Sequence, residues 1–348
     1  MRATVVPPDP SWPERAHEEA ERIARVLPGV LFIHHIGSTS VPALCAKPVI
    51  DLMPVVTDIA AVSAAEGALA SLGYEAMGEF GLPGRRYFRK GRDQRSHHLH
   101  VYQVDHPDIA RHLAFRDYLR AHPVQRDRYG ALKERLAAEV DGDIERYMAG
   151  KDPFIKGLEP IASAWWRPVQ VCAISGPVGV GKTTVMAAVG DLLRQAGVAH
   201  ALVDRDALTE IWPRSPGDPF AAALGLANLG QLWRHARAAG GRCLVVAGVL
   251  ETQSDVDALS LAIPDARVQV VRLRAPLDVL RARIAEREQG DGLSWHLARG
   301  AELARILEES GPPALTVDAS DSADQVALRI MAGTRLLARL ADSDLADR

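Results

Sequence analysis

The sequence contains few cysteines, no long apolar run and almost no net charge. Cys45, Cys172 and Cys243 are far apart and form no CxxC pair, so we expect reduced thiols and a cytoplasmic protein. No apolar run reaches the length of about 18 residues that a membrane span needs, and the first residues lack the apolar segment of a secretory signal. The formal net charge of −3 gives no argument for general nucleic-acid or membrane binding.

The length and composition favour two globular domains. The chain has 348 residues, of which 47% are hydrophobic and 24% charged, enough for two buried cores. Residues 160–168 separate a first half rich in His, Arg and Tyr from a second half rich in Ala, Leu and Val. We therefore predict a boundary near Trp166, with domains at 1–166 and 167–348.

A phosphate-binding motif is the most informative feature that is present. Residues 176–183 read Gly-Pro-Val-Gly-Val-Gly-Lys-Thr, which matches the eight-residue P-loop (Walker A) pattern. A strand-like run, 169–175, precedes it, and a helix-like run, 184–194, follows. Glycines let backbone N–H groups surround a phosphate at the start of a helix. The motif predicts ATP and Mg²⁺ as cofactors, bound by Gly176, Gly179, Gly181, Lys182, Thr183 and Thr184, with the Thr183 hydroxyl on the metal.

The second half alternates strand-like and helix-like segments. Alternation of this kind predicts an α/β fold, a P-loop NTPase parallel sheet with helices on both faces and right-handed crossovers. The ligand site should lie at the carboxyl edge of the sheet. The expected strands are 199–203, 243–247, 268–273 and 315–318, and the expected helices are 220–239, 255–262, 277–288, 297–309 and 322–340.

Two acids directly follow the strand 199–203. Asp204 or Asp206 could accept a proton from a substrate hydroxyl while the other orients substrate or metal. The alternative is a helix cap by Asp206 in a solvated turn. The strand 243–247 lacks the terminal Asp of many ATPases. Mg²⁺ is then held through water or by Asp204 or Glu251, unless Glu251 is only an exposed loop acid.

Two arginines in the segment 277–288 complete the candidate catalytic set. Arg283 and Arg287 are four residues apart and so share a helix face. Such a pair could clamp the transferring phosphates, although a solvated Arg/Glu helix has the same pattern. With the P-loop and residues 204–206, this half resembles the small-molecule P-loop kinases, such as adenylylsulfate kinase and gluconate kinase. The resemblance implies ATP-dependent phosphoryl transfer, with the arginines as lid residues.

The first half carries a second candidate ligand site in a mixed α+β pattern. The turn Gly37-Ser38-Thr39-Ser40 follows a strand-like segment, and Lys47 and Asp51 come shortly after it. Backbone N–H groups and a hydroxyl at such a turn can bind phosphate, and Asp51 could bind a metal. A run of this composition also makes an ordinary helix cap.

Two histidines extend this candidate site. His98 and His100 alternate on a strand-like segment and so point to one face. With Asp51 or His35 they could form a divalent-metal site of two imidazoles and one carboxylate. The alternative is a structural or surface pair of histidines.

The first half resembles the GrpB family over residues 5–166. The resemblance rests on Trp12-Pro13, the Gly37–Pro42 turn, Ala46-Lys-Pro48, Asp51, Arg85-Arg-Tyr-Phe88, His97-His-Leu-His100, Phe115–Arg120 and Lys133. It implies a nucleotidyltransferase-like fold. Nucleotidyltransferases pair the Gly-Ser turn with an Asp-x-Asp/Glu strand, but the residue two after Asp51 is Met53, which argues against transferase activity.

Together these features predict an ATP-dependent kinase of a small molecule, whose partners are a nucleotide and an unidentified acceptor. GrpB-like domains are also joined to dephospho-CoA kinases, which favours a nucleotide- or coenzyme-related acceptor. One alternative is an ATP-hydrolysing switch that drives the first half as a ligand sensor. Another is an active nucleotidyltransferase in the first half.

Overall fold

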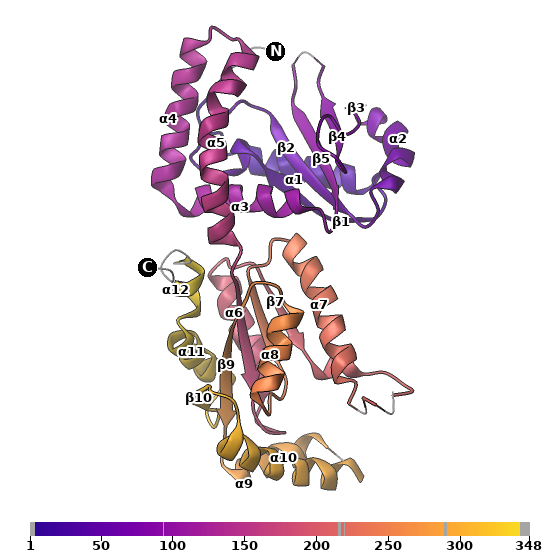
Figure 1. Ribbon diagram of the computed structural model, residues 1–348, viewed down its shortest axis with the longest axis vertical. Helices are drawn as coiled ribbons and strands as arrows, with labels where there is room; N and C mark the ends of the chain where they lie inside the picture. The colour runs from indigo at the N-terminus through magenta and orange to yellow at the C-terminus, as the bar shows by residue number, and fades with distance from the viewer. Residues whose placement is uncertain (1–3, 93, 215–216, 219, 289–290, 342–348) are drawn as a thin grey trace. The chain divides into compact units, whose positions relative to one another are not determined.

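The protein forms two compact units, residues 1–167 and 168–348 (Figure 1). The computed structural model describes residues 4–92, 94–214, 217–218, 220–288 and 291–341. Each unit has its own five-stranded sheet. Among the described residues, no helix combines the length and the apolar content needed to cross a lipid bilayer.

The first unit is a mixed sheet with helices, as the α+β prediction expected. Its sheet order is β1-β2-β5-β4-β3; β2 and β5 are parallel, and the other pairs are antiparallel. α3, α4 and α5 pack against one another. The elements are α1 (Trp12–Ala24), β1 (Val30–Ile36), η1 (Ser38–Ser40), β2 (Ile50–Val56), η2 (Ala60–Ala65), α2 (Glu66–Ser71), β3 (Tyr74–Ala76), β4 (Arg86–Lys90), β5 (His97–Gln103), α3 (Pro107–Ala121), α4 (Pro123–Glu139) and α5 (Ile144–Trp166).

The strands of the first unit place apolar and polar side chains on opposite faces. Ile50 and Leu52 of β2, with Leu99 of β5, join the apolar core that includes residues of α1. Because side chains alternate along a strand, Asp51 and His98 lie on the other face. The pairing of β2 with β5 sets these two residues directly opposite each other.

Two local features of the first unit differ from the pattern-based expectation. Residues 60–72 have a pattern that favours a single helix, but they begin as a 3₁₀ helix, η2, and become α-helical only in α2. Strand β3 was not expected, because its three residues at the edge of the sheet show no period of their own.

The second unit is a parallel α/β sheet, and this part of the fold prediction is confirmed. The strand order is β10-β9-β6-β8-β7, and every pairing is parallel. The elements are β6 (Val169–Ser175), α6 (Lys182–Gln195), β7 (His200–Asp204), η3 (Asp206–Thr209), α7 (Ala222–Ala238), β8 (Cys243–Ala247), α8 (Gln253–Ala262), β9 (Ala266–Arg274), α9 (Leu277–Arg287), α10 (Asp291–Ser310), β10 (Leu315–Asp318), α11 (Ala323–Thr334) and α12 (Leu336–Ala341).

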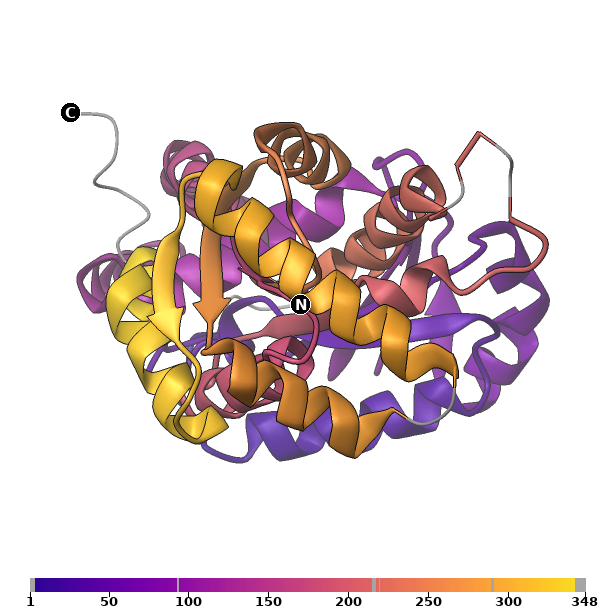
Figure 2. The same ribbon diagram turned by 90° about the horizontal axis from the view of Figure 1, so that it is seen from below.

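Helices cover both faces of this sheet (Figures 1 and 2). Cys172 and Ile174 of β6 belong to the core that includes residues of α6 and α11. Val171 and Ala173, the intervening residues, belong to the core that includes residues of α7 and α8. All seven side chains of β6 are buried, as expected for a central parallel strand between two helical layers.

The last expected helix, 322–340, is interrupted in the structure. It ends as α11 at Thr334 and restarts as α12 at Leu336. Arg335 between them adopts φ +51°, in the left-handed region. A residue with that backbone cannot continue an α-helix. The nearest glycine, Gly333, lies inside α11 and not at the break.

Candidate functional site

The phosphate loop links the carboxyl end of β6 to α6 in the middle of the parallel sheet. β6 pairs with β8 on one side and β9 on the other, and helices from its two sides diverge at such a point to leave a crevice for ligands. Gly179 and Gly181 adopt φ of +81° and +96°. A Cβ on Gly179 would lie 2.7 Å from Cγ1 of Ile284. The loop therefore needs glycine there for both its conformation and its packing on α9.

Lys182 lies over the loop that precedes it. Its Nζ donates to the backbone oxygens of Gly176, at 3.1 Å, and Pro177, at 3.3 Å. Burial lowers the pKa of this lysine, and the charge of Arg287 lowers it further. The charges of Asp206 and Asp204 act to raise it. A lysine ammonium over a glycine-rich loop, with two carboxylates and an arginine near it, suits a phosphate-bearing ligand.

Thr183 and Asp204 form the polar contact beside the loop. The Thr183 hydroxyl donates to Oδ2 of Asp204 at 2.7 Å, and Oδ1 of Asp204 accepts from the backbone N–H of Asp206 at 3.0 Å. Asp204 lies in register with Ala247 on the neighbouring strand. The acid missing from the end of β8 is thus present one strand away, on β7.

A cleft of 680 Å³ opens over the loop and contains most of the predicted residues. Gly179, Gly181, Lys182, Thr183 and Thr184 line it, together with the candidate catalytic residues Asp206 and Arg287. The other polar and aromatic side chains that line the cleft could not be predicted, because they come from loops and helices without a motif. Those side chains are Arg205, Thr209, Glu210, Arg214, Phe220, Asp255, Trp295, His296 and Arg299.

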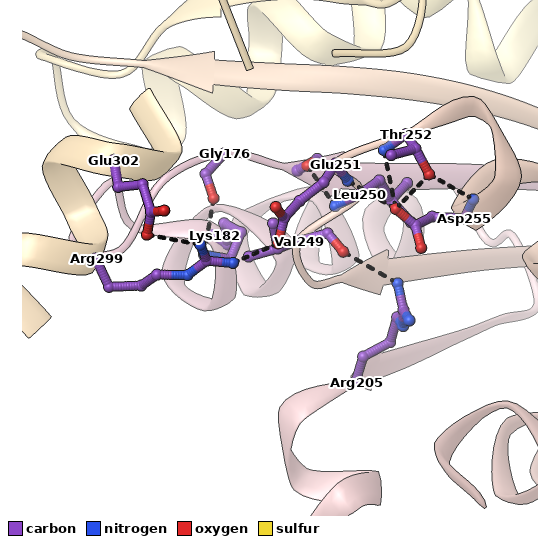
Figure 3. A network of polar contacts seen from close by, with 11 residues as sticks. Gly176, Lys182, Arg205, Val249, Leu250, Glu251, Thr252, Asp255, Arg299 and Glu302 are labelled. Carbon is purple, nitrogen blue, oxygen red and sulfur yellow. Dashed lines mark hydrogen bonds and ion pairs between the residues drawn. The ribbon is translucent and has the colours of Figure 1, made fainter. Parts of the chain in front are cut away.

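Glu251 forms an ion pair with α10 in the cleft wall (Figure 3). Its Oε1 accepts from Nη2 of Arg299 at 2.5 Å, and Nη1 of Arg299 binds Glu302 at 2.8 Å. The backbone N–H of Glu251 also donates to Asp255 at 2.9 Å. In this arrangement Glu251 joins α10 to the loop after β8, and Asp204 is the acid next to the Thr183 hydroxyl.

The loop after β8 is tied to its neighbours at two further points (Figure 3). Nη1 of Arg205 donates to the carbonyl of Val249 at 3.2 Å. The backbone N–H of Leu250 donates to Oγ of Ser175, the last residue of β6, at 2.9 Å. These bonds hold the loop after β8, which contributes Val249 and Glu251 to the lining of the cleft.

The two predicted arginines of α9 have different surroundings. Arg283 donates to the carbonyls of Val180, at 3.3 Å, and Ala319, at 3.0 Å, and so joins the phosphate loop to the segment after β10. Arg287 binds Glu288 at 2.9 Å and is 60% exposed. Of the pair, Arg287 has the side chain that can move onto a ligand in the cleft.

A second cluster lies on the polar face of the first unit's sheet. Nδ1 of His98 and Nε2 of His100 lie 3.0 Å and 3.6 Å from the same oxygen, Oδ1 of Asp51. Burial acts to raise the pKa of Asp51, but the hydrogen bonds from His100 and His98 bring it below its usual value. The carboxylate is therefore ionised at neutral pH. Sequence analysis also offered His35 as a member, but its Nε2 contacts Thr39 Oγ1 at 2.9 Å.

The Gly37–Ser40 turn lies beside this cluster. A Cβ on Gly37, which has φ +70°, would lie 2.4 Å from Oδ2 of Asp51, so the glycine leaves room for the carboxylate. The Ser40 hydroxyl bonds within the turn, to Gly37 O at 2.6 Å. The Thr39 hydroxyl donates to Val49 O, outside the turn, at 3.4 Å.

Two further residues of the predicted site, Ser38 and Lys47, lie near the same cluster. Ser38 is half-buried and interacts with Tyr129. Burial lowers the pKa of Lys47, and the charge of Asp51 opposes that effect.

The first part of the chain is similar to proteins of one family. The family model "GrpB protein" matches residues 2–160. UPF0157 protein YqkA of Bacillus subtilis is 48% identical over 155 residues, 44% of this chain and 45% of that protein. UPF0157 protein BH1888 of Halalkalibacterium halodurans is 38% identical over 163 residues, 46% of this chain and 83% of that protein. The crystal structure of GrpB from Enterococcus faecalis has 47% identity and TM-score 0.45, covering 46% of this chain and 97% of that one.

Two kinases are also similar to the chain. A dephospho-CoA kinase of Mycolicibacterium paratuberculosis is 28% identical over 196 residues, which cover 47% of this chain and 48% of that enzyme. The crystal structure of a gluconokinase from Sinorhizobium meliloti has 22% identity and TM-score 0.36, and covers 51% of this chain and 95% of that one. The chain thus spans about half the length of several curated relatives that it matches.

Proposed function

We propose that this chain, which belongs to the GrpB protein family, is an ATP-dependent kinase whose second unit phosphorylates a small molecule. The observation that carries the proposal is the position of two acids at the phosphate loop. Asp204 binds the Thr183 hydroxyl, and the charges of Asp206 and Lys182 interact across the cleft. In a kinase, an acid at this position can accept the proton of the acceptor hydroxyl.

The residues of the loop fit ATP and Mg²⁺. Backbone N–H groups around Gly179 and Gly181 and the half-buried ammonium of Lys182 suit the phosphates. The oxygens of Thr183 and Asp204 are of the hard type that Mg²⁺ prefers. When bound, the metal would neutralise charge that develops on the phosphates.

Asp206 is the residue we assign as the base. The Thr183 hydroxyl and the Asp206 N–H both bond to Asp204, so that carboxylate is already engaged. Asp206 lines the cleft and can accept the proton that the acceptor hydroxyl loses as its oxygen bonds to phosphorus. Arg287, also in the cleft, can approach the charge that builds up on the transferred group.

The other half of the cleft lining suits an anionic small-molecule acceptor. Arg205 and Arg214 supply positive charge, and Trp295 and Phe220 supply apolar surface. The similarity to a dephospho-CoA kinase supports a kinase of a nucleotide- or coenzyme-like compound.

The proposal is tested by incubating the full chain with γ-labelled ATP, Mg²⁺ and a pool of small metabolites, then identifying the compound that gains label. Asp206→Asn should keep ATP binding and lose label transfer, because only proton acceptance is removed. Asp257→Asn, on the exposed face of α8, is the matched control. ATP hydrolysis without any labelled compound, or wild-type transfer by Asp206→Asn, contradicts the assignment.

A further inference from the structure

The Asp51–His98–His100 cluster has the donor set of a metal centre and no role in the proposed kinase. One potential ligand atom from each residue lies within 4.8 Å of the other two. In a tetrahedral site with bonds of about 2.0 to 2.2 Å, ligand atoms lie about 3.3 Å apart. The two distances to Asp51 Oδ1, 3.0 and 3.6 Å, bracket that value.

The pairing of two strands brings these three residues together. β2 and β5 are parallel and place Asp51 opposite His98, and the two-residue period of β5 places His100 on the same face. Three ligands from two paired strands are more precisely positioned than ligands on loops. Side-chain exposures of 26% for Asp51 and 16% for each histidine leave one side of the cluster open to solvent.

Positively charged side chains lie near the cluster. The charges of Lys47 and Lys151 interact with that of Asp51, and burial together with Lys47 lowers the pKa of Lys151 to about 8. Nη1 of Arg85 lies 3.4 Å from Nδ1 of His100, so a third cation lies beside the cluster. Asp51 would supply only one negative charge to a bound divalent cation. A further anionic ligand would be needed to neutralise the charge of the ion.

We propose that Asp51, His98 and His100 bind one divalent transition metal, with Zn²⁺ as the preferred ion, and that the remaining coordination position takes an anionic oxygen ligand such as a phosphate group. Two imidazoles and one carboxylate suit Zn²⁺ better than Mg²⁺, which prefers oxygen ligands. Three protein ligands with an open fourth position are typical of a reactive zinc site rather than a structural one.

Competing zinc ligands are few in the structure. Cys45, Cys172 and Cys243 are all buried. Among the residues that the structure describes, this is the one group of three or more His, Cys, Asp or Glu side chains with such spacing. The expected stoichiometry is therefore one metal ion per chain.

The test uses the full chain, treated with a chelator and free of nucleotide, in calorimetric titrations with Zn²⁺, Mn²⁺ and Mg²⁺. We expect one equivalent of Zn²⁺ to bind more tightly than the other two ions. Asp51→Asn and His98→Gln should each weaken binding at least about tenfold, and His17→Gln, on the exposed surface of α1, should not. Circular dichroism before each titration shows that the variants are folded.

A second measurement reads the ligand set directly. Co²⁺ in the same site should give the visible absorption of a four-coordinate ion, and inorganic phosphate should shift that spectrum in the wild type more than in Lys151→Ala. No zinc binding by the wild type, or unchanged zinc affinity in folded Asp51→Asn and His98→Gln, overturns the metal site. A cobalt spectrum that phosphate does not change overturns the anionic fourth ligand.

Discussion

The hydroxyl of Thr183 donates a 2.7 Å hydrogen bond to Asp204, and this bond joins the phosphate loop to the neighbouring end of β7. The strand next to β6, β8, ends at Ala247 without an acid. Asp204 is paired in register with that Ala247. The acid therefore lies on the next strand outward, at the same edge of the sheet.

Replacement of Asp204 tests its role as the acid next to the metal. Asp204→Asn should raise the Mg²⁺ concentration needed for half-maximal ATP binding about tenfold, or about 1.4 kcal/mol, because a neutral amide is a poorer ligand than a carboxylate. Titration of Mg²⁺ at fixed ATP measures this, with Asp257→Asn as the control. An unchanged Mg²⁺ requirement would assign Asp204 to a purely structural role.

Replacement of Lys182 tests the nucleotide site itself. Lys182→Ala removes the half-buried ammonium and should weaken ATP·Mg²⁺ binding or turnover by at least about tenfold. Calorimetry with ATP·Mg²⁺ measures the effect. Lys156→Ala, at a lysine that is 73% exposed on α5, should bind like the wild type. Equal affinities for all three proteins contradict a P-loop nucleotide site.

Gly179 and Gly157 should respond to alanine with opposite signs. At Gly179, φ +81° and a Cβ 2.7 Å from Ile284 predict a loss of about 1 to 3 kcal/mol in stability of the second unit. Gly157 lies in α5 with no atom near a built Cβ, so alanine there should stabilise by about 0.5 to 1 kcal/mol. Calorimetric unfolding of the full chain measures both effects. For Gly179→Ala, the transition to follow is the one that ATP·Mg²⁺ shifts. Equal shifts in the two variants contradict the prediction.

Lys133 should make the stability of the first unit depend on pH. Its Nζ donates to the carbonyl of Cys45, and burial lowers its pKa from 10.5 to about 7. Between pH 7 and 10.5 the unfolded chain binds the proton that the folded chain has released, so this residue makes stability rise with pH across that window. Lys133→Met should lose that rise.

Thermal unfolding of the wild type, Lys133→Met and Lys156→Met at several pH values between 7 and 10 tests this prediction. The melting temperature of Lys133→Met relative to the wild type should fall as the pH increases. Lys156→Met should follow the wild type. Parallel curves for all three proteins mean that Lys133 keeps an ordinary pKa in the folded chain.

The phosphate loop could be predicted because its geometry is local. A strand, eight loop residues and a helix are adjacent in the sequence, and each glycine has a backbone reason to be there. The break at Arg335 could not be predicted, because an arginine gives no local signal for φ +51°. The three-residue strand β3 was too short to show a period.

Contacts between distant segments were the hardest to foresee. Arg299 and Glu251 are 48 residues apart, and only the packing of α10 on the loop after β8 brings them together. From the sequence, either Asp51 or His35 could be the third member of the site with His98. The two-residue period of a strand shows which side chains share a face, but the strand order decides which of them meet.

The central place of β6 also bears on when the second unit can bind nucleotide. β6 precedes both of its partners in the chain, and the second, β9, ends at Arg274. Arg283 of α9, which bonds to the loop at Val180, comes later still. During synthesis the loop residues therefore leave the ribosome roughly 60 to 100 residues before the strands and the arginine that fix them, and pairing over such separations is slow to form. Nucleotide binding should accordingly be a late event in the folding of this chain, available only when the second unit is nearly complete.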